Sequence, residues 1–311
     1  MSLPLHGVRA LVAGATRGAG RGIAVALGEA GATVVCVGRS SRSAPGARSE
    51  TIEETAEQVT AAGGLGLARR CDLLDESAAL ALADELRAEL RGLDVLVNDV
   101  WGADHLADFG VPPWEMNLGN VRAMFDSGLV THLVSTRAFT PLLLGSPRPL
   151  VVEITDGDTF GYRGSLGYDL VKMATIRMAW GLNEELAVHG GTAVCVTPGF
   201  LRSEEMLERM GVTEANWRDG AAVDPNFLAS ESPRYVGRAV AALAADPDVR
   251  TRGGRVYSSW ALAGEYGFTD LDGSRPDWRA HWARTFPRPY AAADAAAYAS
   301  WAPGPMEAMK P

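Results

Sequence analysis

VRALVAGATRGAG, residues Val8 to Gly20, joins an apolar run of strand length to a turn rich in glycine. The residues that follow place apolar side chains at helical spacing, with Ile23 and Leu27 on one face. A strand, a glycine turn and a helix in this order let the backbone approach a pyrophosphate at a helix N-terminus, where unpaired N–H groups favour an anion. An ordinary tight turn is the alternative, but it does not require both flanking elements. The stretch therefore predicts a dinucleotide-binding turn.

The rest of the chain continues this alternation of apolar runs and amphipathic stretches. The predicted strands are residues 8–13, 33–37, 65–71, 94–98, 150–155, 192–197 and 255–259, and the predicted helices are 19–30, 49–62, 76–91, 120–144, 166–189 and 233–245. Nearly continuous hydrophobicity in each strand is typical of parallel sheets that are covered on both faces. We therefore predict an α/β fold, a Rossmann-type doubly wound parallel sheet of seven strands in the order 3-2-1-4-5-6-7.

Composition excludes several classes of protein. With 311 residues, of which 47% are apolar, the chain can bury one large core, and its net charge of −9 disfavours a nucleic-acid partner. We find no apolar stretch of signal-peptide length at the amino terminus and no membrane span of roughly 20 apolar residues. The cysteines, Cys36, Cys71 and Cys195, are scattered in apolar runs, which fits a reducing compartment and no metal site. We expect a cytoplasmic protein without a membrane partner.

Tyr168 and Lys172 lie four residues apart in GYDLVKM, within a predicted helix. This spacing stacks both side chains on one helix face, where an ammonium lowers the pKa of a phenol. A phenol in that setting can donate a proton to a carbonyl oxygen. An exposed pair is the alternative for the spacing alone, but the glycine turn upstream favours a catalytic pair.

The second predicted strand ends VGRS, residues 37 to 40, without the carboxylate that usually accepts the ribose hydroxyl of NAD. Arg39 and Arg17, which lies inside the glycine turn, can instead bind a 2′-phosphate. We therefore predict NADP(H) in preference to NAD(H). Solvated surface charges are the alternative for both arginines, and Arg42 or Arg48 of the loop that follows can join or replace them.

Over about residues 5 to 260 these features resemble a short-chain dehydrogenase/reductase, and the chain is similar to the subgroup typified by dehydrogenase/reductase SDR family member 1. The resemblance rests on the glycine turn, Asp72, Asn98, Tyr168 with Lys172, and Pro198-Gly199. It implies that Asp72 binds the adenine amine and that Asn98 stabilises the central sheet beside the cofactor. It also implies that the segment after Pro198-Gly199, including Ser203, holds the nicotinamide end.

The resemblance implies hydride transfer between a nicotinamide and a carbonyl or alcohol carbon. Tyr168 would supply the proton, and Lys172 would hold the nicotinamide ribose and depress the pKa of Tyr168. The expected cofactor contacts are Gly14, Thr16, Arg17, Gly18, Ala19, Gly20, Arg39, Ser40, Asp72, Leu73, Asn98, Val100, Tyr168, Lys172, Pro198, Gly199, Leu201 and Ser203.

The position of the family's catalytic serine departs from the pattern. Thr155 lies there, 13 residues before Tyr168, and its hydroxyl would polarise the substrate carbonyl. Asp156 takes the place instead if the loop is offset by one residue. Its carboxylate would then raise the pKa of Tyr168 or act as a base itself.

Two further family positions differ as well. The usual Asn-Asn-Ala-Gly appears as NDVW, residues 98 to 101, and the asparagine that anchors the proton-relay water aligns with Gly128. Glycine has no side chain for that task. Asn117, Asn120 and His132 are candidates to compensate, although none aligns naturally.

We expect residues 1–261 to form the dinucleotide-binding and catalytic domain, with a lid at about 199–232, and residues 262–311 to form a C-terminal extension. The lid segment contains Met206, Met210, Trp217 and Phe227, which is typical of a mobile cover over an apolar pocket. Trp101, Trp114 and Tyr162 are candidates for the walls of that pocket.

The predicted function is NADP(H)-dependent oxidoreduction of a carbonyl or alcohol group on an apolar small molecule. Relatives usually assemble through the helices predicted at 120–144 and 166–189, so a homodimer or homotetramer is expected. Two alternatives stay open: a cofactor-binding regulator with little catalysis, and a lyase or epimerase that uses Asp156 as its base.

Overall fold

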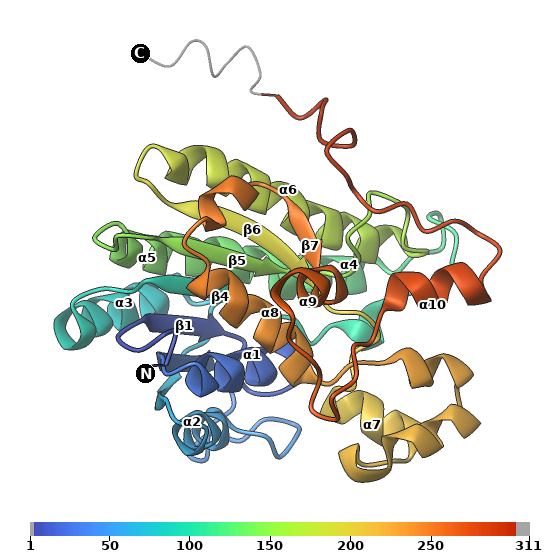
Figure 1. Cartoon of the computed structure of the whole chain (residues 1–311), viewed down its shortest axis with the longest axis horizontal. Helices are drawn as coiled ribbons and strands as arrows, with labels where there is room; N and C mark the ends of the chain where they lie inside the picture. Colours follow the sequence, from blue (N-terminus) through green and yellow to red (C-terminus); the bar gives the residue numbers. More distant parts are fainter. Residues whose placement is uncertain (1–2, 303–311) are drawn as a thin grey trace.

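The computed structural model describes residues 3–302 and contains one parallel sheet of seven strands (Figure 1). The strand order is β3-β2-β1-β4-β5-β6-β7, as predicted. The strands are β1 Arg9–Ala13, β2 Thr33–Gly38, β3 Leu65–Arg70, β4 Val95–Asn98, β5 Leu150–Ile154, β6 Thr192–Thr197 and β7 Val256–Ser258. Each begins and ends within one residue of its predicted range, because the apolar runs are bounded by polar residues or glycine.

Helices connect the strands and cover both faces of the sheet (Figure 1). The α-helices are α1 Gly18–Glu29, α2 Ile52–Ala61, α3 Glu76–Leu90, α4 Leu118–Phe125, α5 Thr131–Leu143, α6 Leu166–Ala187, α7 Glu204–Met210, α8 Pro233–Ala245, α9 Ser259–Tyr266 and α10 Trp278–Thr285. Shorter turns are η1 Asp104–Leu106, η2 Asp126–Val130, η3 Glu214–Ala222, η4 Pro225–Ala229 and η5 Val249–Arg252.

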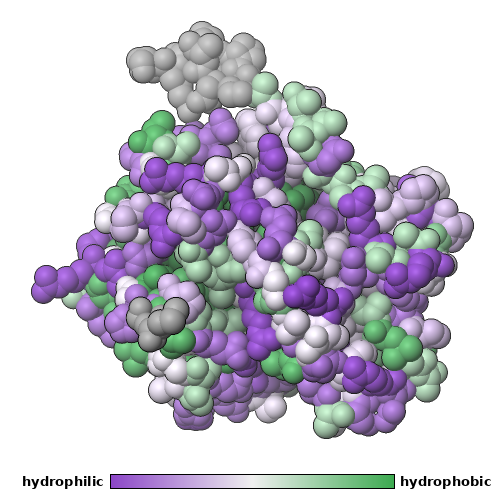
Figure 2. Space-filling model, viewed as in Figure 1, coloured by the Kyte–Doolittle hydropathy of each residue, from purple (hydrophilic) through white to green (hydrophobic). Residues whose placement is uncertain are grey.

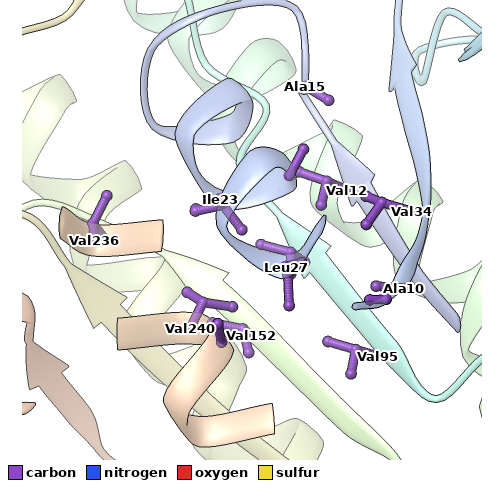
Figure 3. Packing of buried hydrophobic residues seen from close by; sticks show 14 of the residues in the cluster. Ala10, Val12, Ala15, Ile23, Leu27, Val34, Val95, Val152, Val236 and Val240 are labelled. Carbon is purple, nitrogen blue, oxygen red and sulfur yellow. The ribbon is translucent and has the colours of Figure 1, made fainter. Parts of the chain in front are cut away.

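One face of the sheet packs against α1, α2 and α8. Alternate strand residues such as Val12 and Val152 contact Leu27 of α1 and Val240 of α8 (Figure 3). The opposite face packs against α3, α5 and α6, where Phe139 of α5 lies in the same buried cluster as strand residues. Because side chains alternate along a strand, two-sided burial requires the continuous apolar runs from which the sheet was predicted.

Helices α1 and α8 cross at unusually short range. A Cβ at Gly22 would lie 2.0 Å from the Pro233 carbonyl oxygen, and a Cβ at Gly237 would lie 2.4 Å from the Gly22 carbonyl oxygen. Neither position has room for a side chain. This contact fixes the direction of α1, and therefore the position of its N-terminus at the glycine turn.

The helix predicted over residues 120–144 is present from Leu118 to Leu143, but its hydrogen-bond pattern changes part-way along it. Five residues of π-helix, Asp126–Val130, separate α4 from α5 and contain Gly128. Glycine weakens a regular helix, and π-helical turns occur frequently at functional sites. The predicted helix is therefore confirmed, with a π-helical turn at the position where the family's relay asparagine aligns.

The segments that lacked clear periodicity also contain helices. Within the predicted lid, α7, η3 and η4 enclose a small core of their own, formed by Met210, Trp217 and Phe227. Those side chains therefore do not face the pocket, contrary to expectation, whereas Met206 does. The expected boundary after residue 261 falls inside α9, and residues 303–311 of the extension lie outside the described residues.

The extension continues from α10 past α6 and β7 (Figure 1). The Tyr298 hydroxyl accepts a hydrogen bond from the Val256 N–H of β7 at 2.9 Å, and Trp301 packs edge-on against Trp180 of α6. One face of α6 is thus covered by this chain's own residues. On the face shown in Figure 2, hydrophilic residues predominate and hydrophobic ones lie in small groups among them.

Candidate active site

The carboxyl ends of the strands open into two neighbouring cavities. The smaller, about 290 Å³, is lined by residues that follow β1, β2, β3 and β4, and the larger, about 920 Å³, by residues that follow β4, β5 and β6 together with the extension. Open α/β sheets bind ligands at this edge. The two cavities share Ala19, Asp99, Val100, Trp101, Asp104, Leu201 and Ser203.

Most of the predicted site residues line one or both cavities. The smaller cavity contains Gly14, Thr16, Arg17, Gly18, Ala19, Arg39, Ser40, Asp72, Leu73, Val100, Leu201 and Ser203. The larger contains Thr155, Asp156, Tyr168, Lys172, Pro198, Gly199 and Tyr162. Gly20 and Asn98 line neither, and Trp114, whose side chain is 83% exposed, is not in a cavity wall.

The glycine turn leaves an anion site at the start of α1. Gly14 has a φ of +91° and lies so close to the Asp99 carbonyl oxygen that a Cβ would be 2.4 Å from it. The Gly18 N–H donates to the Glu204 carboxylate of α7 at 2.7 Å, and the Arg21 guanidinium lies 3.6 Å from the same carboxylate. An anionic group from the lid segment therefore occupies the place at which a dinucleotide phosphate is expected. Its presence there indicates that the turn fits such a group.

The arginines around the smaller cavity differ in their partners. Arg42 forms a bidentate ion pair with Glu57. Arg48 forms ion pairs with Glu50 and with Glu208 of α7. Those two side chains already have carboxylate partners. Arg39 is largely exposed and lies 4.0 Å from Asp72, while Arg17 is half-buried in the cavity wall. Of these four arginines, Arg39 and Arg17 line the smaller cavity.

Helix α6 presents Tyr168 and Lys172 to the larger cavity, and both side chains are only 8% exposed. The Tyr168 hydroxyl donates to the Asp156 carboxylate at 2.9 Å. Burial raises the pKa of Tyr168 well above its usual value, and the charge of Asp156 raises it further. The expected lowering of this pKa by Lys172 was therefore wrong, because burial and the carboxylate outweigh the ammonium. Burial lowers the pKa of Lys172, an effect that the neighbouring carboxylate of Asp156 opposes.

Thr155 and Asp156 have different surroundings. The Thr155 hydroxyl is buried and donates to the Lys172 carbonyl oxygen of α6 at 2.8 Å, so it ties β5 to the helix backbone. Asp156, one residue later, reaches the Tyr168 hydroxyl. Asp156 therefore makes the contact with the Tyr168 hydroxyl that is expected of the family's catalytic serine.

Arg163 holds the loop that carries Asp156. Its guanidinium donates to the backbone carbonyl oxygens of Asp156 at 2.6 Å and of Thr159 at 2.9 Å, and it pairs with Asp169 of α6 at 3.1 Å. One side chain therefore links both ends of the loop to the helix of Tyr168. This residue was not among the sequence candidates, since an arginine in a glycine-rich loop gives no distinctive signal.

A buried polar network lies below the cavities. The Asn98 amide donates to Glu153 at 2.8 Å, and His132 lies between Glu153 and the Val100 carbonyl oxygen, 2.7 Å and 3.1 Å away. Ser135 also donates to Asn98 at 2.6 Å. Asn98 therefore joins β4 to β5 and α5 within the sheet, and His132 has partners other than Lys172.

Comparison with known proteins identifies the family. The short chain dehydrogenase family model matches residues 9–214. Dehydrogenase/reductase SDR family member 1 of Mus musculus is 31% identical over 88% of this chain and 86% of its own length, and that of Homo sapiens is 30% identical with the same coverage. The chain belongs to the short-chain dehydrogenase/reductase family. A crystal structure of a short chain dehydrogenase of Mycobacterium thermoresistibile, 22% identical, superimposes with a TM-score of 0.72 over 86% of this chain and 90% of that one.

Membership makes this chain a dehydrogenase or reductase of the short-chain type, a family that transfers hydride with nicotinamide cofactors and acts on small molecules. Within residues 3–302, no helix is both long and apolar enough to cross a membrane. In the same range, no cluster of three or more His, Cys, Asp and Glu side chains is arranged to hold a metal ion.

The larger cavity is bounded by the segment after β6 on one side and by the extension on another. Phe200 packs against Trp278 of α10 with ring centroids 5.8 Å apart, and Trp282 packs against Tyr290 at 5.9 Å. Tyr290 also donates to Asp158 in the loop after β5. No periodic pattern predicts this wall, because its aromatic residues come from a short helix and an irregular segment.

The two walls are joined through a buried arginine. The Arg202 side chain is 1% exposed and contacts Glu214, Asp270 and the ring of Trp217. Asp270 belongs to the predicted extension, so the lid segment and the extension form a continuous structure rather than separable parts.

Proposed function

We propose that this protein interconverts a carbonyl and an alcohol group on an apolar small molecule in the cytoplasm, using NADP(H) in preference to NAD(H). The observation that carries the proposal is the buried pair of Tyr168 and Lys172, next to residues that the larger cavity shares with the smaller one. The aromatic wall formed by Trp260, Trp278 and Trp282 favours a hydrophobic substrate.

When bound, a nicotinamide dinucleotide supplies or accepts the hydride. Gly18 and its neighbours in the turn would hold the diphosphate, and Pro198 to Ser203 would hold the nicotinamide end. Arg17 and Arg39 would pair with a 2′-phosphate, since each lines the smaller cavity. Asp72 would contact the adenine.

Tyr168 would deliver its hydroxyl proton to the substrate oxygen during reduction. Its raised pKa keeps it protonated at neutral pH, which a proton donor requires. The hydroxyl must turn from Asp156 towards the substrate, a rotation about one bond. Lys172, with its Nζ 5.4 Å from the Tyr168 ring centroid, would offset the negative charge that forms on the phenol oxygen.

The cofactor preference is tested by fluorescence titration of the purified protein with NADPH and NADH in parallel at moderate salt. The proposal predicts at least tenfold tighter binding of NADPH, about 1.4 kcal/mol. Arg39→Ala and Arg17→Ala should reduce this difference while leaving NADH binding unchanged. Arg42→Ala is the matched control, because Arg42 is already paired with Glu57. A preference for NADH in the unaltered protein would contradict the proposed phosphate site.

The proton-donor role is tested with the first carbonyl compound that the protein reduces. Tyr168→Phe removes only the hydroxyl and should lower kcat by about 100-fold or more. Unchanged turnover would contradict the role of Tyr168 while leaving the cofactor site unaffected.

The contact between Tyr168 and Asp156 also favours a second candidate function. A carboxylate beside the substrate can act as a base, as a lyase or epimerase on this scaffold would require. Product formed without net oxidation or reduction of the cofactor, and lost in Asp156→Asn, would support that function. Tight cofactor binding with no product of either kind would instead indicate a regulatory protein.

A homodimer or homotetramer is part of the proposal. Leu133 of α5 and Leu170 of α6 are about half exposed, at 52% and 47%, on the helices through which relatives are expected to assemble. Light scattering of the protein after size exclusion tests this, and a monomer at micromolar concentration would contradict it.

A further inference from the structure

Trp101 lies at the centre of the site, although it comes from a position where the family usually has a small residue. It follows β4, and its indole ring packs between the π-helical turn and α6. Its ring contacts Tyr168 edge-on, with centroids 5.6 Å apart. The indole N–H donates to the Asp104 carboxylate at 2.8 Å. Contacts on both ends of the ring thus fix its orientation.

Gly128 provides the space that the ring occupies. A Cβ at Gly128 would lie 2.6 Å from Trp101 Cζ3 and 2.8 Å from a methyl group of Val171. Real Cβ contacts are not so short, so any side chain at 128 would push the indole away. The bulky residue at 101 and the missing side chain at 128 are therefore parts of one arrangement.

The Lys172 ammonium lies over the face of this ring, with Nζ 3.7 Å from the ring centroid of Trp101. A cation in that position is attracted by the electrons of the ring, most strongly by those of tryptophan and when water is excluded. Lys172 is buried, with only 8% of its surface exposed. The charged groups that act on it are Asp156, Asp104, Asp99 and Arg163.

We propose that Trp101 is a positioning residue for the reaction: its ring, seated against Gly128 and oriented by Asp104, holds the Lys172 ammonium beside Tyr168. The ring takes over the support that a hydrogen-bonded side chain at position 128 would otherwise give. The catalytic consequence rests on the proposed function, but the contact between ring and ammonium does not. The two can therefore be tested separately.

The contact is tested through the ionisation of Lys172. Lys172 and Lys310 are the lysines of the sequence, so Lys310→Arg leaves one lysine to label with carbon-13 at Cε. NMR titration of this protein reports the pKa of Lys172 without cofactor or substrate. Trp101→Leu should lower that pKa, decreasing the ratio of charged to neutral lysine between about 2-fold and 30-fold at a given pH.

Two further variants separate the ring from its surroundings. Trp101→Phe keeps a weaker ring face and should give a smaller decrease than Trp101→Leu. Gly128→Ala leaves the indole in the chain but displaces it, and should lower the pKa of Lys172 in the same direction. Trp114→Leu is the control for loss of a tryptophan, because Trp114 is exposed, and it should change nothing.

A Lys172 pKa that is unchanged or raised in both Trp101→Leu and Gly128→Ala would overturn the inference. Folding is checked by far-UV circular dichroism, and if Trp101→Leu fails to fold, Trp101→Phe and Gly128→Ala decide the outcome. Once a substrate is known, kcat should fall in proportion to the loss of charged Lys172, with KM little changed. A lowered Lys172 pKa with unchanged kcat would support the contact between the Trp101 ring and the ammonium but refute its role in catalysis.

Discussion

Removing the carboxylate of Glu204 should tighten cofactor binding. This side chain accepts the Gly18 N–H bond at the start of α1 and lies 3.6 Å from Arg21, where a dinucleotide phosphate is expected. A cofactor must therefore displace Glu204 before its diphosphate can bind. The contact also links the lid helix α7 to the glycine turn, so binding would release that helix from α1.

The size of the effect follows from this contact. A hydrogen bond to a charged acceptor contributes about 1.5–3 kcal/mol net. The Glu204 side chain is 27% exposed, and solvent screening reduces the figure to about 1–2 kcal/mol. Glu204→Ala should accordingly tighten the binding of both NADPH and NADH by about 5-fold to 30-fold. Glu204→Gln should have a smaller effect, because an amide oxygen can still accept the bond.

Fluorescence titration with each cofactor at 0.1 M salt, roughly a 10 Å screening length, is the assay. Glu205→Ala is the matched control, since Glu205 lies in the same first turn of α7 and lines the smaller cavity. It corrects for the loss of one negative charge near the phosphates. If Glu204→Ala binds the cofactors no more tightly than Glu205→Ala does, Glu204 does not compete with the diphosphate.

Three other variants test the site and its support. Arg202→Ala should lower the free energy of unfolding in urea by about 3–5 kcal/mol, because it leaves a buried carboxylate unpaired; the exposed control Arg218→Ala should cost under about 1 kcal/mol, and equal effects would contradict this. Burial raises the pKa of Glu231 to about 8, so folding takes up a proton and stability is lost as the pH rises from about 4.5 to 8. The free energy of unfolding of Glu231→Gln, measured with denaturant, should therefore exceed that of the unaltered protein by an amount that grows by about 1 kcal/mol per pH unit over this range. A difference that stays constant with pH would contradict this. Asp156→Asn should lower the pKa of Tyr168 and shift the pH profile of alcohol oxidation to lower pH, and an unshifted profile would oppose the assignment.

The sheet was predictable because its central strands are buried on both faces, although the edge strand β3 is only partly buried. Runs such as residues 192–197 are continuous in hydrophobicity, and the tight α1 turn requires glycine at positions that the sequence shows directly. The Tyr168 and Lys172 pair was predictable as well, since four-residue spacing places both on one face of α6. These features depend on local pattern alone.

What remained unpredicted depends on contacts between distant residues. Glu204 reaches Gly18 across 186 positions, and Trp101 fills space above Gly128 that no local pattern reveals. The departures at 101 and 128 were visible in the sequence, but their dependence on each other was not. Short helices such as α10 were not predicted either. Their aromatic residues pack on one another and on the lid segment instead of forming a regular apolar stripe.

Isotope transfer tests the central proposal most directly. The protein is incubated with NADPH deuterated at the transferable C4 position and a panel of hydrophobic ketones and aldehydes, and the alcohol products are analysed by mass spectrometry. One deuterium is expected on the carbinol carbon, and the product should be lost in Tyr168→Phe. An alcohol without deuterium, or no product despite tight NADPH binding, would contradict the proposal.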